Sequence, residues 1–350
     1  MYWHEHLRRS AKLAIVGGLH YTGMLGLIRR RMMRDRALIL MYHRVNPRGY
    51  GAPDYSPVGM SVTPEEFSMQ MRFVKRHYDV VPLSKVVEAV RSGDRFAPNL
   101  CAITFDDGWE DVYRFAFPIL REEKVPATIF LTSGFIDGAP WHWEEHARYL
   151  LAIIHQRRNA PDFAAHAPAV RAALEVHGLG DLPDRTDAEL AMWLITHGRR
   201  LKQYDDSRRA SMLEEFAALA KRVAPQAPRP FMNWDEIREM RAAGVEFGNH
   251  TVSHAELPSL SDEQLARELD GAARRIHEAV GTPATDFAYP YGKFDERVLE
   301  GVRRTGAHSA CTTRFGLVER QADPFALKRI NMCSDVGAFE PLFAARVLGF

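Results

Sequence analysis

Short apolar segments alternate with helical patterns over most of this chain, and this alternation constrains its fold more than any other feature. Apolar, β-branched runs predict strands at residues 37–43, 78–82, 100–105, 127–132, 245–250, 286–290, 308–313 and 325–330. Helical patterns fall between them at residues 64–77, 83–93, 110–124, 261–280 and 294–305. Such an alternation predicts a parallel sheet with helical crossovers, and seven or eight such units suit a closed α/β barrel.

Residues 141–228 interrupt this rhythm. They are rich in Ala, Arg, Leu and Glu, and they contain no segment with a clear strand pattern. We interpret them as a helical insertion between two barrel strands. The predicted organisation is therefore an N-terminal segment (1–36), a barrel (37–140 plus 229–350) and a helical insertion (141–228).

Charge is distributed unevenly along the chain. The 350 residues contain 46 Lys and Arg against 45 Asp and Glu, so no overall attraction to nucleic acid is expected. Residues 1–36 alone hold eight basic and two acidic residues, which favours contact with an anionic surface. The three cysteines form no CxxC pair and predict no disulfide framework.

The N-terminal segment combines this charge with an apolar stretch. Residues 13–28 lack formal charges but fall short of the roughly 20 residues that span a bilayer as a helix. Arginines flank the stretch and no small-residue cleavage site follows, so no cleavable signal peptide is expected. We interpret residues 1–36 as a peripheral element in a membrane interface, on a side left open. The alternatives are a helix packed on the body or a partner, and a short uncleaved anchor.

Two adjacent acids end the strand at residues 100–105. Asp106 and Asp107 lie where barrel enzymes place catalytic groups, at the C-terminal end of a strand. Neighbouring side chains on an extended backbone diverge, so one acid could bind a metal ion and the other could move a proton. The alternative is an ordinary Asp-Asp-Gly turn that begins the next helix.

Two histidines follow another predicted strand. His250 and His254 are four residues apart and could face one metal ion if the chain turns there. A second pair, His142 and His146, has the same spacing but opens the insertion, and we expect a surface or packing role for it. Together with Asp107, the first pair forms a three-ligand site whose donor set favours zinc, and Asp106 remains as the general base.

Aromatic residues accompany both motifs. The sequence FAYPYG follows a predicted strand and ends in a turn, where a backbone N–H could face a developing oxyanion. Trp109, Tyr289 and Pro290 are predicted to bind sugar rings, and Trp141 and Trp143 could add to that surface. The alternatives are core packing for the tryptophans and a simple strand-ending turn for FAYPYG.

The three motifs, in this order, resemble the polysaccharide deacetylases of the NodB homology type (carbohydrate esterase family 4). TFDDG, HTVSH and YPYG resemble the first three motifs of that family, and LILMYHRV, FPILREEKVPATIFLT and ALKRI resemble its flanking segments. The basic, apolar N-terminal segment before YHRV is similar to that of deacetylases that accompany bacterial exopolysaccharide assembly. The resemblance implies a distorted parallel (β/α) barrel and the metal-dependent removal of N-acetyl groups. It also implies a role in carbohydrate metabolism.

The resemblance also implies roles for individual residues. Asp106 matches the base, while Asp107, His250 and His254 match the metal ligands. Tyr291 matches the residue whose backbone N–H helps to bind the oxyanion.

Two positions depart from the family pattern. Ala288 replaces the arginine that orients the base, so we expect that interaction to be missing. The late Leu-x-His motif, which supplies the general acid, is also absent, and His308 lies at the start of the matching strand rather than at its end. We predict that His43, at the end of the first strand, replaces it as the acid. The alternative is a histidine that contacts Asp106 and only maintains structure.

These observations predict a polysaccharide N-deacetylase, a membrane-associated metal-binding hydrolase that uses zinc. Its expected substrate is an N-acetylhexosamine polymer, such as a bacterial exopolysaccharide, and exopolysaccharide assembly proteins are candidate partners. One alternative is an O-acetyl esterase that acts on a glycan. Another is a non-catalytic glycan-binding or assembly protein with the same fold.

Overall fold

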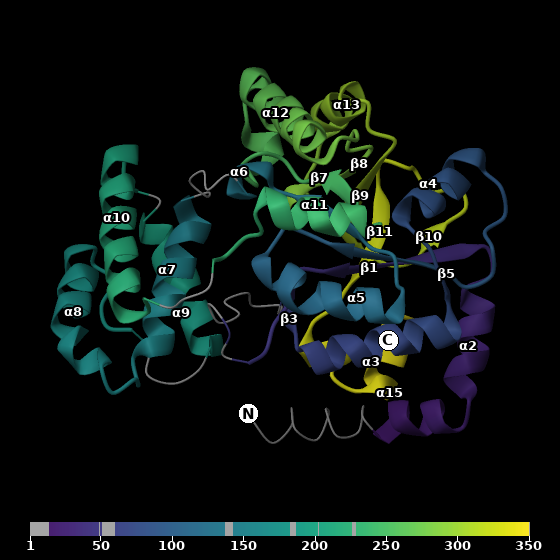
Figure 1. The fold of residues 1–350 in the computed structure, drawn as a ribbon, viewed down its shortest axis with the longest axis horizontal. Coiled ribbons are helices and arrows are strands. Elements are labelled where there is room, and N and C mark those ends of the chain that lie inside the picture. The colour runs from purple at the N-terminus through teal and green to yellow at the C-terminus, as the bar shows by residue number, and fades with distance from the viewer. Residues whose placement is uncertain are drawn as a thin grey trace. The chain divides into compact units, whose positions relative to one another are not determined.

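Seven parallel strands close into a barrel (Figure 1). The computed structural model describes residues 14–48, 50, 60–136, 143–182, 187–201, 203–225 and 229–349. Around the barrel the order is β1, β11, β9, β8, β7, β6 and β5, and β5 pairs with β1 again to close the ring. These strands are β1 (Arg36–Tyr42), β5 (Leu100–Phe105), β6 (Thr128–Leu131), β7 (Glu246–Asn249), β8 (Asp286–Ala288), β9 (Ser309–Phe315) and β11 (Leu327–Asn331). The predicted α/β barrel of about seven strands is confirmed.

Within the described residues, four short strands lie outside the ring. β4 (Asp79–Val80) pairs with β5 in parallel, and β10 (Val318–Glu319) pairs with β1 in antiparallel. β2 (Arg44–Val45) and β3 (Ser61–Val62) form a separate pair. The strand predicted at residues 78–82 therefore exists but does not belong to the closed barrel.

Helices surround the strands, and local sequence signals begin several of them (Figure 1). Thr63, Asn233 and Ser261 each accept a hydrogen bond from the backbone of a residue three positions later, whose side chain bonds back in a capping box. The helices are α3 (Pro64–His77), α4 (Leu83–Ser92), α5 (Phe117–Glu123), α6 (Ser133–Ile136), α11 (Trp234–Ala242), α12 (Asp262–Val280), α13 (Glu296–Arg304), α14 (Ser334–Gly337) and α15 (Glu340–Arg346). A π-helical turn, Val112–Ala116, precedes α5, where the sequence predicted one continuous helix.

The barrel strands are buried on both faces. Every residue of β5 is buried, and so is every residue of β1 after Arg36. Such strands read as continuous apolar runs because helices cover their outer side. The largest fully buried side chain is nevertheless an arginine, Arg329 of β11. A buried guanidinium needs a charged partner, and Arg329 pairs with Asp106 at the C-terminal end of the barrel.

The N-terminal segment forms helices against the barrel unit. Residues 14–21 are helical, and α2 (Met24–Met32) leads into β1. Val16, Leu25 and Met33 are buried, whereas other apolar side chains of the segment are exposed. The first 13 residues of the predicted 1–36 segment lie outside the described residues. Within the described part, no helix is long and apolar enough to cross a membrane.

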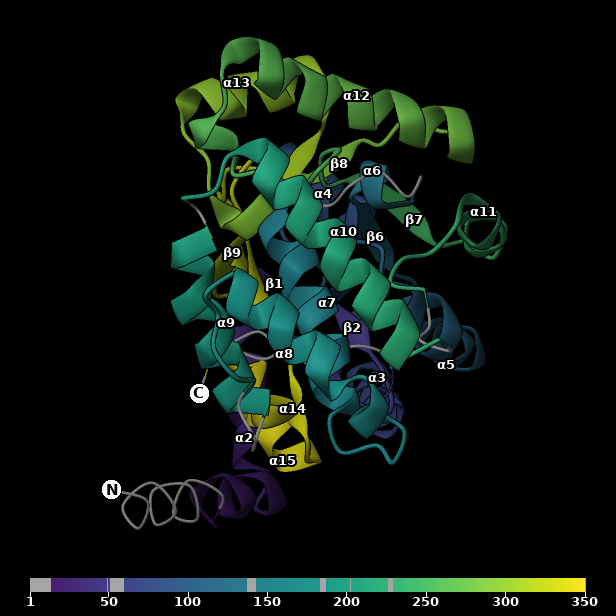
Figure 2. The ribbon, with the colours of Figure 1, turned by 90° about the vertical axis from the view of Figure 1, so that its left-hand side faces the viewer.

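A second compact unit contains most of the predicted insertion. It comprises residues 47–60 and 138–230, and the described residues between 143 and 223 are mainly helical. The helices are α7 (Trp143–Arg157), α8 (Ala167–Val176), α9 (Asp187–Leu201) and α10 (Asp206–Val223), which pack together around their own apolar core (Figure 2). Ile154, Leu190 and Phe216 lie in that core. Trp141 and His142 lie outside the described residues, so the expected surface or packing role of the pair His142 and His146 stays a prediction.

Candidate active site

The loop after β5 places the two acids in different surroundings. Asp106 continues the strand, whereas Asp107 has a positive φ of 75°. Gly108 follows with a φ of 89°, and its carbonyl accepts a hydrogen bond from the N–H of Met232. The tight turn therefore directs the two neighbouring carboxylates to different partners.

The loop after β7 is fixed by side chains that cap its backbone. Asn249 accepts a hydrogen bond from the N–H of Thr251 at 2.8 Å. Glu268 of α12 accepts hydrogen bonds from the N–H groups of Val252 and Ser253, each at 2.9 Å. These bonds hold the turn that brings the two histidines of HTVSH onto one side of the loop.

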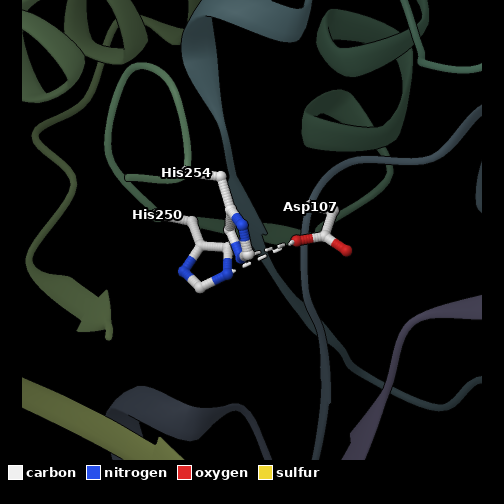
Figure 3. Close-up of side chains that lie close together, drawn as sticks. All are labelled: Asp107, His250 and His254. Carbon is white, nitrogen blue, oxygen red and sulfur yellow. Dashed lines mark ion pairs between the residues drawn. The ribbon is translucent and has the colours of Figure 1, made fainter. Parts of the chain in front are cut away.

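Asp107, His250 and His254 converge (Figure 3). One ligand atom from each lies within 4.8 Å of the others. Nε2 of His250 is 3.4 Å and Nε2 of His254 is 3.6 Å from the same oxygen, Oδ1 of Asp107. Nδ1 of His250 donates to the carbonyl of Ala288 at 2.7 Å. Because a carbonyl only accepts, this bond leaves the lone pair of Nε2 on the side of Asp107.

The donor set fits a divalent metal ion. Oδ1 of Asp107 is buried and has no hydrogen-bond partner in the structure. Its other oxygen, Oδ2, accepts a hydrogen bond from the indole N–H of Trp109 at 2.8 Å. A buried carboxylate oxygen that faces two imidazole nitrogens is costly without a cation between them. Two histidines and one carboxylate are a donor set that zinc accepts.

Trp109 positions this ligand through its own network. The guanidinium of Arg44 lies over the indole ring at 4.7 Å, and Nε of Arg44 donates to Asp111 at 2.7 Å. The indole is also 4.7 Å from the ring of Phe231. Arg44 and Phe231 thus both pack against the indole ring, which restrains the direction of its N–H.

We expect Trp109→Phe to weaken metal binding about 10- to 100-fold, because it removes the N–H that orients Asp107 while keeping an aromatic ring. The measurement is the zinc dissociation constant by competition with a chromophoric chelator. Trp143→Phe, in the helical unit, is the matched control and should leave the constant unchanged. An unchanged constant in Trp109→Phe would show that the indole N–H does not orient the ligand.

Asp106 is held by a buried arginine. Nη1 and Nη2 of Arg329 each donate to one oxygen of Asp106 at 2.7 Å. Nε of Arg329 donates to the carbonyl of Thr312 at 3.0 Å, so the guanidinium is fixed in its plane. The expectation that no arginine orients this carboxylate was wrong. Ala288 of β8 stands where the family motif has its arginine, and Arg329 supplies the guanidinium instead from β11, which lies between β9 and β1.

Both carboxylates stay ionised in this environment. Burial opposes ionisation of Asp106, but Arg329 and the imidazoles of His250 and His43 outweigh it and lower its pKa below the ordinary value. Burial likewise opposes ionisation of Asp107, but the nearby imidazoles of His250 and His254 outweigh it and lower its pKa below the ordinary value. Asp106 is therefore an ionised carboxylate at neutral pH.

His43 lies beside Asp106 at the end of β1. Its Nε2 is 4.0 Å from Oδ2 of Asp106, and its Nδ1 is buried without a hydrogen-bond partner. His308 precedes β9, at the opposite end of the barrel strands, and its backbone N–H bonds to Thr285. The structure thus places His43, and not His308, next to the predicted base.

The aromatic residues separate into buried and exposed groups. Trp109 and Tyr289 are buried, Tyr289 stacks on Phe294 with ring centroids 4.4 Å apart, and Pro290 is buried as well. The prediction that Trp109, Tyr289 and Pro290 bind sugar is not supported, because their surfaces are occupied by the core. Tyr291 is 45% exposed, and its ring lies 4.7 Å from that of His254.

Backbone strain gathers at this site. The described chain has seven non-glycine residues with positive φ, and four of them are Asp107, Thr251, His254 and Tyr291. Residues other than glycine adopt this conformation at a cost, and they cluster where function demands a particular geometry. Two residues that hold this site in place, Arg329 and Glu268, were not identified from the sequence. ALKRI was the only sequence signal that pointed towards the first.

Comparison with known proteins identifies the family. The family described as polysaccharide deacetylase matches residues 94–157 and 185–310. YxkH of Bacillus subtilis (strain 168) is 26% identical over 295 residues, which cover 84% of this chain and 70% of that protein. The poly-beta-1,6-N-acetyl-D-glucosamine N-deacetylase of Staphylococcus aureus (strain MSSA476) is 23% identical over 242 residues, which cover 67% of this chain and 79% of that protein.

A solved structure shares the fold. The deacetylase PplD of Streptococcus pyogenes, in complex with acetate, aligns with a TM-score of 0.57 at 16% identity. The alignment covers 91% of this chain and all of that one (100%). The matched family spans the β5 motif and both histidines, and the chain belongs to the polysaccharide deacetylase family.

Proposed function

We propose that the protein is a metal-dependent N-deacetylase that removes acetyl groups from an N-acetylhexosamine polysaccharide. One observation carries the proposal: Nε2 of His250 and Nε2 of His254 converge on the buried Oδ1 of Asp107, directly beside a carboxylate that Arg329 keeps ionised. The named activity of the Staphylococcus aureus relative supports a β-1,6-linked N-acetylglucosamine polymer as the substrate. A bacterial exopolysaccharide is the corresponding natural source.

The residues have separate tasks in this reaction. A divalent cation, which we propose is zinc, would be held by Asp107, His250 and His254, and it would supply an acidified water and polarise the acetamide carbonyl. Asp106 accepts the proton of the attacking water. The backbone N–H of Tyr291 faces the oxyanion that develops on the acetyl carbonyl. His43 donates a proton to the amine that leaves, so the products are acetate and a free amino sugar.

Acetate release tests this proposal. We expect the protein to release acetate from oligomers of β-1,6-linked N-acetylglucosamine, to lose this activity after exhaustive chelation and to regain it when zinc is added. O-acetylated oligomers assayed in parallel distinguish an esterase from an amidase. Full activity after chelation would contradict the metal mechanism. Binding of oligomers without acetate release would favour a non-catalytic glycan-binding protein.

His43→Ala tests the proposed acid. We expect acetate release from the amide substrate to fall about 10²- to 10⁴-fold, because the amine must be protonated to leave. An activated aryl acetate, whose leaving group needs no proton, should lose far less activity, and metal content should be unchanged. His308→Ala is the matched control. Equal losses on amide and aryl ester would assign a structural role to His43.

A further inference from the structure

Exposed apolar side chains gather in the N-terminal helices. Among the described residues, nine large apolar side chains are exposed, and four of them are Ile15, Tyr21, Met24 and Leu27. Tyr21 is 83% and Leu27 is 62% exposed. Two adjacent helical segments therefore present apolar groups to solvent, although Val16 and Leu25 anchor the same segments by burial.

The exposed face of α2 changes from apolar to basic along its length. Met24, Leu27 and Arg31 follow one another at helical spacings of three and four, so they share one face, and the exposed Arg34 follows in the turn after the helix. Arg30 is exposed beside them. Leu25 and Met33 lie on the opposite face and are buried. The helix thus has an apolar exposed beginning and a cationic exposed end.

A basic pocket continues this face. It has a volume of about 620 Å³ and is lined by Arg30, Arg34 and Arg95, with Met33, Phe96 and Asp35 among its other walls. Asp35 pairs with Arg320 at 3.5 Å. Within the described residues, the side chains of Arg30, Arg34 and Arg95 form no ion pair or hydrogen bond. Three guanidinium groups around an apolar floor suit an anionic headgroup.

This face lies at the end of the barrel away from the metal site. α2 leads into the first residue of β1, and Arg95 lies in the loop that leads into β5. Asp107 follows the opposite, C-terminal end of β5, and His250 follows the C-terminal end of β7. Figure 1 shows α2 beside the start of β1.

We infer that the α2 face docks on a membrane surface rich in anionic phospholipid. The lipid phosphate enters the pocket of Arg30, Arg34 and Arg95, while Tyr21, Leu27 and their apolar neighbours enter the interface. Charge complementarity selects this occupant: exposed apolar side chains bordered by arginines are the composition of helices that lie in the interface of an anionic membrane. Docking in this orientation turns the metal site away from the lipid and towards polymer in the aqueous phase.

Vesicle co-sedimentation of the full chain tests this inference. The probes are vesicles of phosphatidylcholine alone and of phosphatidylcholine with phosphatidylglycerol. We expect binding to the anionic vesicles only, weakened by added salt. The triple variant Arg30→Gln/Arg34→Gln/Arg95→Gln should bind about a hundred-fold more weakly, since each basic residue near such a surface contributes about one kcal/mol. Leu27→Gln should bind about ten-fold more weakly.

Matched variants and a second readout complete the test. Lys221→Gln/Arg222→Gln/Arg274→Gln removes the same charge elsewhere, and Met192→Gln removes a similar exposed side chain; both should bind like the unaltered protein. All variants should keep the melting temperature and the turnover of soluble oligomers. Equal binding to neutral and anionic vesicles, or equal losses in both triple variants, would overturn the inference. Light scattering gives another outcome that would overturn the inference. If the unaltered protein is a dimer and the Arg30/Arg34/Arg95 variant is a monomer, this face binds a second copy of the chain.

Discussion

Asp107→Asn is expected to abolish metal binding and acetate release while leaving the fold intact. Trp109 can only donate to residue 107, so the asparagine carbonyl will take that bond. The amide NH₂ then points at the imidazoles where the unpartnered Oδ1 now lies. A donor replaces a ligand, and we expect the zinc dissociation constant to rise more than about 100-fold and activity to fall at least about 10³-fold.

The measurement combines metal content after equilibrium dialysis with the rate of acetate release. Asp106→Asn is the informative control, because it should retain the metal and still lose turnover. The two variants together distinguish the metal ligand, Asp107, from the general base, Asp106, although the two residues are adjacent. Zinc bound by Asp107→Asn at unaltered affinity would show that this carboxylate is not a ligand.

Arg329→Met is expected to give the largest loss of stability. The guanidinium side chain is fully buried and pairs with both oxygens of Asp106. Its removal leaves a buried carboxylate without a countercharge, and we expect the free energy of unfolding at pH 7 to fall by about 3–5 kcal/mol. Acetate release should fall as well, because burial then raises the pKa of Asp106 and removes the ionised base.

The loss of unfolding free energy in Arg329→Met should be smaller in acid than at neutral pH. In the unaltered protein the lowered pKa of Asp106 stabilises the fold above the unfolded value of about 3.9, and this contribution is lost as pH falls through the folded pKa. In Arg329→Met the pKa is raised, so acid stabilises the variant relative to neutral pH. The difference in unfolding free energy should therefore narrow between pH 7 and pH 4.

Urea unfolding at both pH values measures the effect. Arg329→Lys keeps the charge but not the two parallel hydrogen bonds, and it should lie between the unaltered protein and Arg329→Met. The double variant Asp106→Asn/Arg329→Met should recover part of the lost stability, since it leaves no buried charge. A loss that is the same at pH 7 and pH 4 would show that Asp106 is not the group stabilised by Arg329.

The barrel and the convergence of the three candidate ligands were predictable because their signals are local. A buried parallel strand is a continuous apolar run, and the polar residue that follows it lies at the mouth of the barrel. Asp107 and His250 could therefore be assigned to one end of the fold before any geometry was known. β4 was harder, because a two-residue strand beside the ring has the same apolar pattern as a ring strand.

Arg329 could not be assigned from sequence because its partner is 223 residues away. ALKRI shows only an apolar strand with two adjacent basic residues, and the sequence does not say which of the two side chains points inward. Lys328 is exposed and Arg329 is buried, a difference set by the pleat. The same limit applies to Tyr289, which is buried, and Tyr291, which is 45% exposed, because the turn between them has a positive φ of 57° at Tyr291 that the sequence does not announce.

The position of β11 has a consequence for the timing of activity. Asp106, Asp107, His250 and His254 all leave the ribosome before Arg329 does, and β11 enters the ring between β9 and β1 only afterwards. Until then, Asp106 has no guanidinium to hold its charge as the barrel buries it. A chain that ends before β11 lacks the guanidinium that pairs with Asp106, so we expect it to lack an ionised carboxylate beside the three candidate ligands and to release no acetate.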